Sequence, residues 1–347
     1  MNVWIDICHT PQYNFYKNFI LRLVDEGNNV MLTVLDRGKT PVIIKRELQN
    51  LSNVSIDIIG KHRLNKLSAV LEANLCRLVK LFKWASNRKI DIGFSNAYPL
   101  SCVCWFKKIP CYTFDDDPQT IDYKPKIWFS NLSHYCLYEV PKVYKLSSKV
   151  KVLKALKEWS YLSPSVFKAD IKALDEYNLK PKTYIFLREV SVGTVNYTGQ
   201  ASGAILNVKD LLPKDKKVIF SLEDKSKRYM YPSDWIHLQE PVKDIHSLIY
   251  YSAALVSSGD SMAREAALLG VPSYYLGIRH SMPANIAASK VAGLKNEVSM
   301  PFVSWIDSLE CKTTEELIEK QQETIKNIDN TFTDINEYIW RLLYMAY

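Results

Sequence analysis

The segment with the clearest chemical potential is a Ser/Gly turn inside the run 256–272, which reads VSSGDSMAREAALLGVP. The apolar residues Ala253–Val256 predict a strand, and the residues after the turn predict a short helix that ends at Gly270. Such a turn presents backbone N–H groups and the positive end of a helix dipole, which together bind phosphate. We therefore predict that a phosphate-bearing ligand binds this turn through Ser258, Gly259, Asp260, Ser261 and Met262.

Glu265 lies one helical turn after Ser261 on the same predicted helix. A carboxylate close to a phosphate is electrostatically unfavourable unless it accepts hydrogen bonds, and sugar hydroxyls can donate them. A nucleotide ribose is such a sugar, so the pattern predicts a nucleotide site in which Glu265 binds the ribose. The alternative is an ordinary strand–turn–helix unit of an α/β protein.

Acidic and imidazole side chains also follow two predicted strands in the first half of the chain. Asp6 and His9 follow Val3–Ile7, and either could be the base that takes a proton from an acceptor hydroxyl. The alternatives are that Asp6 caps the next helix and that His9 packs locally. Three further carboxylates follow the strand Pro110–Phe114, namely Asp115, Asp116 and Asp117. Adjacent carboxylates raise at least one pKa unless a cation or an acceptor sugar separates them, and a solvated turn is the alternative.

The elements that must position these side chains alternate between strands and helices along the whole chain. This rhythm predicts an α/β protein with two Rossmann-like domains and a cleft between them. We expect residues 1–150 to form the first domain, 151–164 a linker, and 165–347 a second domain closed by C-terminal helices. Ligands of such sheets bind at the carboxyl ends of the strands.

Charge is distributed unevenly over the 347 residues, whose formal net charge is +8. Residues 1–150 contain 21 Lys and Arg against 13 Asp and Glu, whereas the remainder contains 24 of each. The entire excess therefore lies in the first half, which indicates an anionic partner such as a membrane surface, an acidic glycan or a lipid-linked acceptor. We expect no nucleic-acid partner, because no recognised binding module is present.

A basic amphipathic helix is predicted around Leu64–Lys89. One face would carry Leu67, Leu71, Leu75, Leu78 and Phe82, and the cations around it are Lys66, Arg77, Lys80, Lys83 and Arg88. Such a helix can lie on an anionic bilayer, and the alternative is a helix that covers the sheet with a solvated outer face.

The chain has no run of about 18 apolar residues, and its start does not resemble a secretory signal. Its seven cysteines are scattered and include no CxxC pair, which favours reduced thiols over a zinc site. These features predict a cytoplasmic protein, with peripheral binding to the inner membrane face as a further option.

The Ser-Gly turn, Glu265 and the following AALLGVP together resemble the donor-binding segment of GT-B glycosyltransferases. The familiar case is the enzyme that adds N-acetylglucosamine to lipid I, and the UDP-N-acetylglucosamine 2-epimerases share the scheme. In those families the Glu binds the uridine ribose and the turn binds the diphosphate. The resemblance implies that Arg188 meets the diphosphate, that His280 and Asn285 contact the donor sugar, and that Pro241–His246 takes the place of the loop that holds the uracil.

Three stretches resemble an uncharacterised archaeal and bacterial family of GT-B-like proteins, classed as a domain of unknown function and sometimes found in surface-polysaccharide gene clusters. They are residues 3–18, residues 94–117 and the glycine turn with the helix before it, residues 248–259. The first loop of that family usually has a His after the Pro, where this chain has Gln12. Gln12, Asp115 and Asp117 are accordingly expected to bind the acceptor, and Asp6, His9 or Asp116 to act as catalyst.

These resemblances imply a glycosyltransferase that uses a nucleotide sugar, with a UDP-sugar favoured, to build a surface glycan. They imply a reaction without a metal or other cofactor, because GT-B enzymes offset the diphosphate charge with a helix N-terminus and a cation. Two alternatives remain open. One is a sugar-nucleotide 2-epimerase, and the other is a non-catalytic protein that binds nucleotide sugars.

Overall fold

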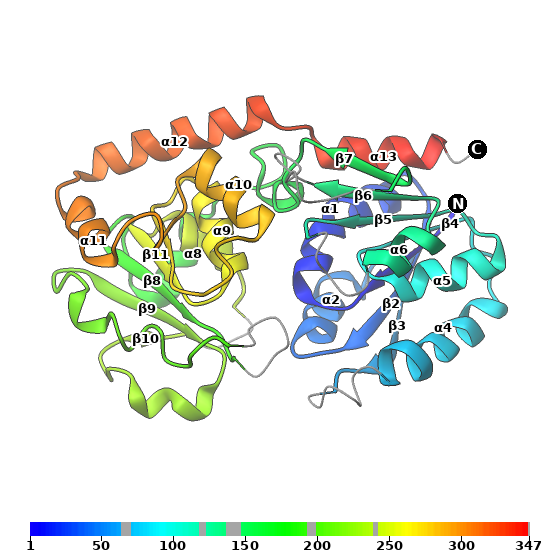
Figure 1. The fold of residues 1–347 in the computed structure, drawn as a ribbon, viewed down its shortest axis with the longest axis horizontal. Coiled ribbons are helices and arrows are strands. Elements are labelled where there is room, and N and C mark those ends of the chain that lie inside the picture. The colour runs from blue at the N-terminus through cyan, green and yellow to red at the C-terminus, as the bar shows by residue number, and fades with distance from the viewer. Residues whose placement is uncertain (64–70, 118–122, 137–146, 193–198, 239–241, 346–347) are drawn as a thin grey trace. The chain divides into compact units, whose positions relative to one another are not determined.

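The computed structural model of the protein describes residues 1–63, 71–117, 123–136, 147–192, 199–238 and 242–345 (Figure 1). The chain divides into two compact units. Unit 1 comprises Met1–Tyr161 together with Thr333–Tyr347, and unit 2 comprises Leu162–Phe332. Each unit contains one parallel sheet with helices packed against it, so the predicted pair of Rossmann-like domains is confirmed.

Unit 1 is built on a seven-stranded parallel sheet in the order β3-β2-β1-β4-β5-β6-β7. The direction in which successive strands are added reverses between β1 and β4, which pair directly. Such a reversal is where doubly wound sheets bind their ligands. The strands are β1 (Asn2–Ile7), β2 (Asn29–Asp36), β3 (Val54–Lys61), β4 (Ile92–Ser95), β5 (Cys111–Asp115), β6 (Leu132–Cys136) and β7 (Val150–Leu153).

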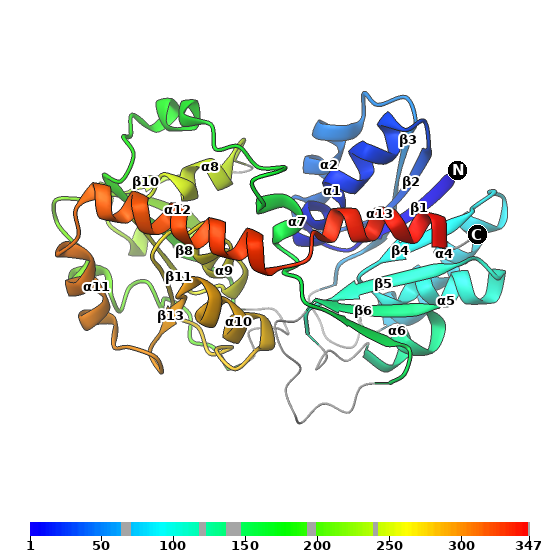
Figure 2. The same cartoon turned by 90° about the horizontal axis from the view of Figure 1, so that it is seen from above.

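Helices cover both faces of the unit 1 sheet. On one face α4 packs against α5, and α5 packs against α6 (Figures 1 and 2). Prolines stand in the first turns of α1, α2 and α5, where the missing N–H costs no intrahelical hydrogen bond. The helices are α1 (Thr10–Asp25), α2 (Thr40–Leu48), α4 (Arg77–Ser86), α5 (Tyr98–Lys107), α6 (Tyr123–Phe129) and α13 (Ile335–Met345), with a π-helical turn at Glu72–Cys76 directly before α4.

Helix α13 belongs to unit 1, whereas its place in the chain predicts that it closes the second domain. Its apolar side chains join the core formed by β1, β2, β4 and α1, and five of them are buried: Ile335, Ile339, Trp340, Leu342 and Leu343. The stretch 151–164, which we expected to be a linker, contains most of β7 and the short helix α7 (Trp159–Leu162). The boundary between the units falls inside α7.

Unit 2 is built on a six-stranded parallel sheet in the order β10-β9-β8-β11-β12-β13, which reverses between β8 and β11. The strands are β8 (Tyr184–Glu189), β9 (Lys217–Leu222), β10 (Ile236–His237), β11 (Ala254–Ser257), β12 (Ser273–Tyr275) and β13 (Lys295–Asn296). The α-helices are α8 (Ile245–Tyr250), α9 (Asp260–Leu268), α10 (Pro283–Ala292), α11 (Phe302–Glu310) and α12 (Thr314–Thr331), and 3₁₀ helices occur at Ile171–Tyr177, Lys209–Leu211 and Lys225–Met230.

Two local features fix the ends of α9 and α12. Thr313 and Glu316 form a reciprocal capping box at the start of α12. Gly270 ends α9 with a φ of +70°, and a Cβ at this position would lie 2.6 Å from the backbone oxygen of Gln321 in α12. Only glycine allows this turn and this close approach of two helices. Among the described residues, no helix is long and apolar enough to cross a membrane.

Candidate functional site

The residues predicted to carry chemistry follow strands at or next to the two reversal points. In unit 1, Asp6 lies in β1 and His9 follows it, while the Asp115–Asp117 turn begins at the end of β5. In unit 2, Arg188 lies at the end of β8 and Ser258 follows β11. Parallel strands place these positions at one edge of each sheet, so each unit gathers its candidate residues at the edge where ligands bind.

The Ser-Gly turn of unit 2 is held rigidly by its own serines. The Ser257 hydroxyl accepts a hydrogen bond from the Gly259 N–H at 2.9 Å. Ser258 is fully buried, and its hydroxyl accepts from the Val190 N–H at 2.9 Å while its own N–H donates to the Arg188 carbonyl at 2.9 Å. The turn is thereby tied to the end of β8 across the reversal point of the sheet. Ser258 therefore positions the turn, and Gly259 is the N-cap of α9.

The first turn of α9 carries charge of both signs. Asp260 is buried, and its carboxylate forms ion pairs with Arg264 at 3.2 Å and with Arg279 at 2.9 Å. The partly exposed Ser261 and Met262 follow in the same turn, and the Ser261 N–H donates to the Asp260 carboxylate at 3.1 Å. Arg264 and Arg279 thus place two guanidinium groups beside this helix end, and guanidinium groups suit a phosphate.

The same network reaches α10 through Asn285. The side-chain Oδ1 of Asn285 accepts a hydrogen bond from Arg264 at 2.8 Å. The side-chain Nδ2 of Asn285 donates to the backbone carbonyl of Arg279 at 2.6 Å. Asn285 is 1% exposed, so its present role is to fix the loop that carries Arg279. His280, the other residue expected at the donor sugar, is exposed in that same loop.

Glu265 lies on the second turn of α9 and is buried. Its Oε2 lies 3.3 Å from Nε2 of His246 on α8. The sequence placed His246 at the end of a uracil-binding segment, whose first residue, Pro241, lies outside the described residues. The contact between Glu265 and His246 was not predicted, because 19 residues and a whole strand separate them.

Arg188 and Glu189 close the end of β8. Arg188 donates to the Ser221 hydroxyl at 2.7 Å and pairs with Glu223 at 2.8 Å. Glu189 is 3% exposed and accepts from the Ile205 N–H at 2.8 Å, and burial raises the pKa of its carboxyl. Arg188 thus keeps a cation at the reversal point of the sheet, held by side chains of the neighbouring strand and the loop after it.

Asp6 is fully buried in unit 1, where it forms a bidentate ion pair with Arg77 of α4. The two carboxylate–guanidinium distances are 2.6 and 3.0 Å, and the Thr33 hydroxyl donates to the same carboxylate at 2.6 Å. The Arg77 Nε also donates to the Ile59 carbonyl at 3.0 Å. The Asp6 carboxylate has no exposed surface in this structure, and these contacts fix it in the core of unit 1.

His9 is the N-cap residue of α1 and is half-buried. Burial and the charges of Arg37 and Lys157 lower the pKa of its imidazole from 6.5 to about 3, while Asp116 acts weakly in the opposite direction. The imidazole is therefore neutral at physiological pH, and these surroundings make it a weaker base than an ordinary histidine. Gln12, one turn later, is buried and accepts from the Cys8 N–H at 2.7 Å, which fixes the loop before His9.

Two lysines pair with carboxylates of the Asp115–Asp117 turn. Lys126 of α6 pairs with Asp115, which also accepts from the N–H groups of Asp116 and Asp117. Lys157, just before α7, pairs with Asp116 at 2.8 Å, and the nearby carboxylates raise its pKa. All three aspartates, taken as whole residues, are less than a tenth exposed, so the turn is a buried ion-pair cluster and not a solvated loop. Lysine supplies the cation that adjacent carboxylates require.

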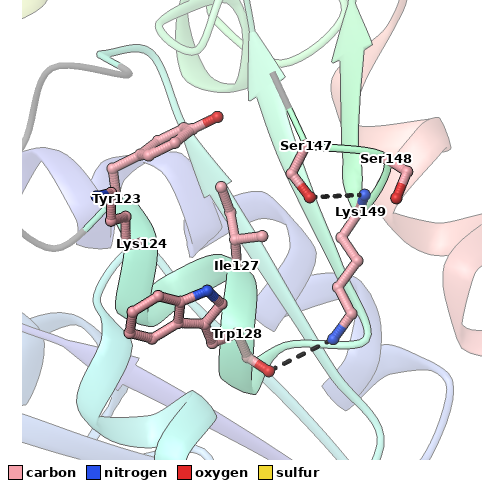
Figure 3. A pocket seen from close by; sticks show the side chains of 7 residues that line it. All are labelled: Tyr123, Lys124, Ile127, Trp128, Ser147, Ser148 and Lys149. Carbon is pink, nitrogen blue, oxygen red and sulfur yellow. Dashed lines mark hydrogen bonds between the residues drawn. The ribbon is translucent and has the colours of Figure 1, made fainter. Parts of the chain in front are cut away.

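A pocket of about 490 Å³ opens in unit 1 beside α6 and the start of β7 (Figure 3). Lys149 at its edge donates to the Trp128 carbonyl at 3.4 Å. None of the predicted site residues lines it; its lining residues are Tyr123, Lys124, Ile127, Trp128, Ser147, Ser148 and Lys149. The pocket and the candidate chemistry therefore occupy different parts of unit 1.

Sequence comparison identifies a family for the first part of the chain. Residues 1–124 match the family described as "Protein of unknown function (DUF354)", which confirms the resemblance to a family of unknown function. No curated protein matches the chain by sequence.

Solved structures of nucleotide-sugar enzymes share the fold of the entire chain. The UDP-GlcNAc 2-epimerase of Methanocaldococcus jannaschii, in complex with UDP-GlcNAc and UDP, matches with a TM-score of 0.67 at 13% identity, over 99% of this chain and 100% of its own. The UDP-GlcNAc 2-epimerase of Neisseria meningitidis, bound to UDP-GlcNAc, gives 0.62 at 14% identity over the same shares. The spinosyn rhamnosyltransferase SpnG, complexed with thymidine diphosphate, gives 0.63 at 10% identity, again over 99% and 100%.

The chain therefore has the GT-B-like fold that epimerases and glycosyltransferases of nucleotide sugars share. At these identities the similarity establishes the fold alone, and the activity must be argued from the residues.

Proposed function

We propose that the protein is a glycosyltransferase that takes a UDP-sugar as donor and acts in the synthesis of a surface glycan. The observation that carries this proposal is the construction of the β11–α9 turn in unit 2. A rigid Ser-Gly turn, a helix N-terminus with two arginines and the buried Glu265 follow one another at the reversal point of a parallel sheet. Diphosphate and ribose are the ligand groups that these side chains match.

In unit 2, the first turn of α9 would hold the diphosphate, with Arg279 and Arg264 offsetting its charge. Glu265 would accept hydrogen bonds from the ribose hydroxyls, and its contact with His246 keeps the carboxylate in place. Arg188 is a third cation at the same sheet edge. These groups stabilise a leaving nucleoside diphosphate without a metal ion, which supports a metal-independent reaction.

In unit 1, we assign the base to His9 and not to Asp6. The neutral imidazole takes the proton of the acceptor hydroxyl, the hydroxyl oxygen bonds to the anomeric carbon, and the bond from that carbon to the diphosphate breaks. The carboxylate of Asp116, which pairs with Lys157, acts to raise the pKa of His9 and so opposes the effect of the two cations. An anionic acceptor beside Arg37 and Lys157 would offset the two cations and so raise the basicity of the imidazole.

Charge distribution favours transfer over 2-epimerisation. The +8 excess in residues 1–150 suits an anionic acceptor such as a polyprenyl-phosphate-linked or acidic glycan. An epimerase acts on the nucleotide sugar alone and has no such requirement. Incubation of the protein with UDP-sugars in the absence of an acceptor separates the two activities, since only an epimerase changes the sugar under those conditions.

Calorimetric titration with UDP tests the donor site directly. Glu265→Ala should weaken UDP binding by about 1–3 kcal/mol, the cost of losing hydrogen bonds to a charged group. Glu265→Gln, which keeps the side-chain size, should retain part of that affinity. The matched control is Glu319→Ala, which removes an exposed carboxylate from α12 of the same unit. Equal UDP affinity in the Glu265→Ala protein and in the control would refute the assignment.

A further inference from the structure

Helix α4 turns a row of large apolar side chains outward. The inner face of α4 packs on the core of unit 1. Leu81 and Ala85 are buried in a cluster with Trp4, and Arg77 forms an ion pair with Asp6. Arg77, one of the cations predicted around the apolar face of this helix, lies on the inner side of α4 and is 2% exposed. The outward row has helical spacing and begins in the π-helical turn, with exposed fractions of 62% for Leu75, 48% for Val79 and 39% for Phe82.

Two aromatic residues at the end of α5 extend this row. Trp105 is 54% exposed and Phe106 is 60% exposed. The Phe106 ring lies 6.2 Å from that of Phe82 and 4.9 Å from that of Trp105, so the two helices form one continuous apolar surface. We call the surface formed by Leu75, Val79, Phe82, Trp105 and Phe106 the α4–α5 face. A contiguous exposed patch of this kind marks an interaction site, unlike single exposed apolar residues.

Cations surround the α4–α5 face. Lys80 and Lys83 are exposed on α4, and the ammonium group of Lys107 lies 5.3 Å from the centre of the Phe82 ring. Lys108 is exposed directly after α5. From residue 75 to 108 the sequence has seven Lys and Arg but a single acid, Asp91, which accepts from the Asn2 N–H at 2.7 Å. No carboxylate of this stretch therefore offsets the lysines at the face.

We infer that the α4–α5 face docks unit 1 on the surface of a bilayer that contains anionic lipid. Trp and Phe side chains favour the interface between lipid headgroups and acyl chains, and lysines around them attract anionic headgroups. A second copy of the chain would bring lysines against lysines, so the charge selects the bilayer as the occupant. This inference goes beyond the proposed function, since docking requires neither nucleotide binding nor transfer.

Flotation with vesicles tests the docking. The full-length protein should bind vesicles of phosphatidylcholine with phosphatidylglycerol much more tightly than vesicles of phosphatidylcholine alone. Binding should weaken at about 1 M salt, where the Debye length falls to roughly 3 Å. Each lysine near an anionic surface contributes about a fivefold change in affinity, so Lys80→Gln/Lys83→Gln should lower binding by roughly 25-fold.

The matched control is Lys312→Gln/Lys326→Gln, which removes two exposed lysines from unit 2 and should leave vesicle binding unchanged. Trp105→Ala/Phe106→Ala should lower binding to the anionic vesicles by about tenfold or more. Circular dichroism of each variant checks that the fold is retained.

Three results would overturn the inference: no vesicle binding, equal binding to both vesicle types, or an equal effect of the two lysine pairs. Docking of a second copy would replace it if the protein dimerised and Trp105→Ala/Phe106→Ala made it monomeric without altering vesicle binding.

Discussion

The ion pair between Asp6 and Arg77 should contribute to the stability of unit 1 and not to chemistry. Asp6 has no exposed surface and Arg77 is 2% exposed. Arg77→Met removes three hydrogen-bond donor contacts and leaves a buried carboxylate whose closest remaining donor is the Thr33 hydroxyl. Breaking one partner of a buried pair costs about 3–5 kcal/mol, because the other charge is left uncompensated.

A double-mutant cycle measures this effect. Asp6→Asn and Arg77→Met should each lower the free energy of unfolding by about 3–5 kcal/mol. In the double variant the free energy of unfolding should decrease by only about 1–3 kcal/mol, mainly because the Ile59 carbonyl loses the hydrogen bond that Arg77 donates. The cycle should thus yield a coupling energy of about 3 kcal/mol or more.

Urea unfolding, followed by tryptophan emission, is a suitable assay. The Trp4 indole donates to the Thr33 hydroxyl at 2.9 Å, and Thr33 in turn donates to Asp6, so Trp4 reports on this part of the core. UDP binding to unit 2 should be unchanged in folded Asp6→Asn. An Asp6→Asn protein of normal stability that had lost transfer activity would refute the structural assignment and restore Asp6 as a catalytic residue.

Four further outcomes follow from the structure. Transfer should persist in EDTA, and activity that vanished and returned with manganese would contradict the metal-independent proposal. Gly270→Ala should destabilise unit 2 by about 2 kcal/mol or more in urea unfolding, because its Cβ would meet the backbone of Gln321; an unchanged midpoint would show that the helices can separate freely. Burial lowers the pKa of His134 to about 4, so the unfolded chain takes up a proton below its ordinary value of 6.5 while the folded chain does not. The free energy of unfolding should therefore decrease as the pH is lowered from 6.5 to 4. His134→Gln should make this dependence on pH less steep, and an unaltered dependence would contradict the assignment. The acid limb of kcat/KM that depends on His9 should lie below pH 6.5, and an acid limb that persisted unchanged in His9→Gln would exclude His9 as the base.

The two sheets could be predicted from the sequence, because their strands are apolar runs separated by helical periods. The position of α13 could not. Its pattern of Ile335, Ile339 and Leu343 predicts an amphipathic helix, but such a pattern does not specify which sheet the apolar side covers. Chain order suggested the second sheet, whereas packing against α1 places it on the first.

Partners distant in sequence explain the remaining differences at the candidate site. The burial of Arg77 could not be predicted, because its partner Asp6 lies 71 residues away in another element. Similarly, the lysines that pair with the acidic turn lie 11 residues after Asp115 and 41 residues after Asp116. The types and spacing of the acids indicated that cations or sugars were needed, but only the folded chain identifies which cations supply the charge.

The return of α13 to unit 1 has a consequence for synthesis on the ribosome. Chains fold as they emerge, and a continuous domain can finish as soon as its last residue is released. Residues 162–332 form one continuous segment, so unit 2 needs no later part of the chain to complete its fold, whereas unit 1 must wait for residues 335–345. Until then, the surface of α1 and β4 that later receives Ile339 and Trp340 stays open to solvent. The half of the protein that is made first therefore depends on the last helix, and a chain that stopped at residue 332 would leave that apolar surface exposed.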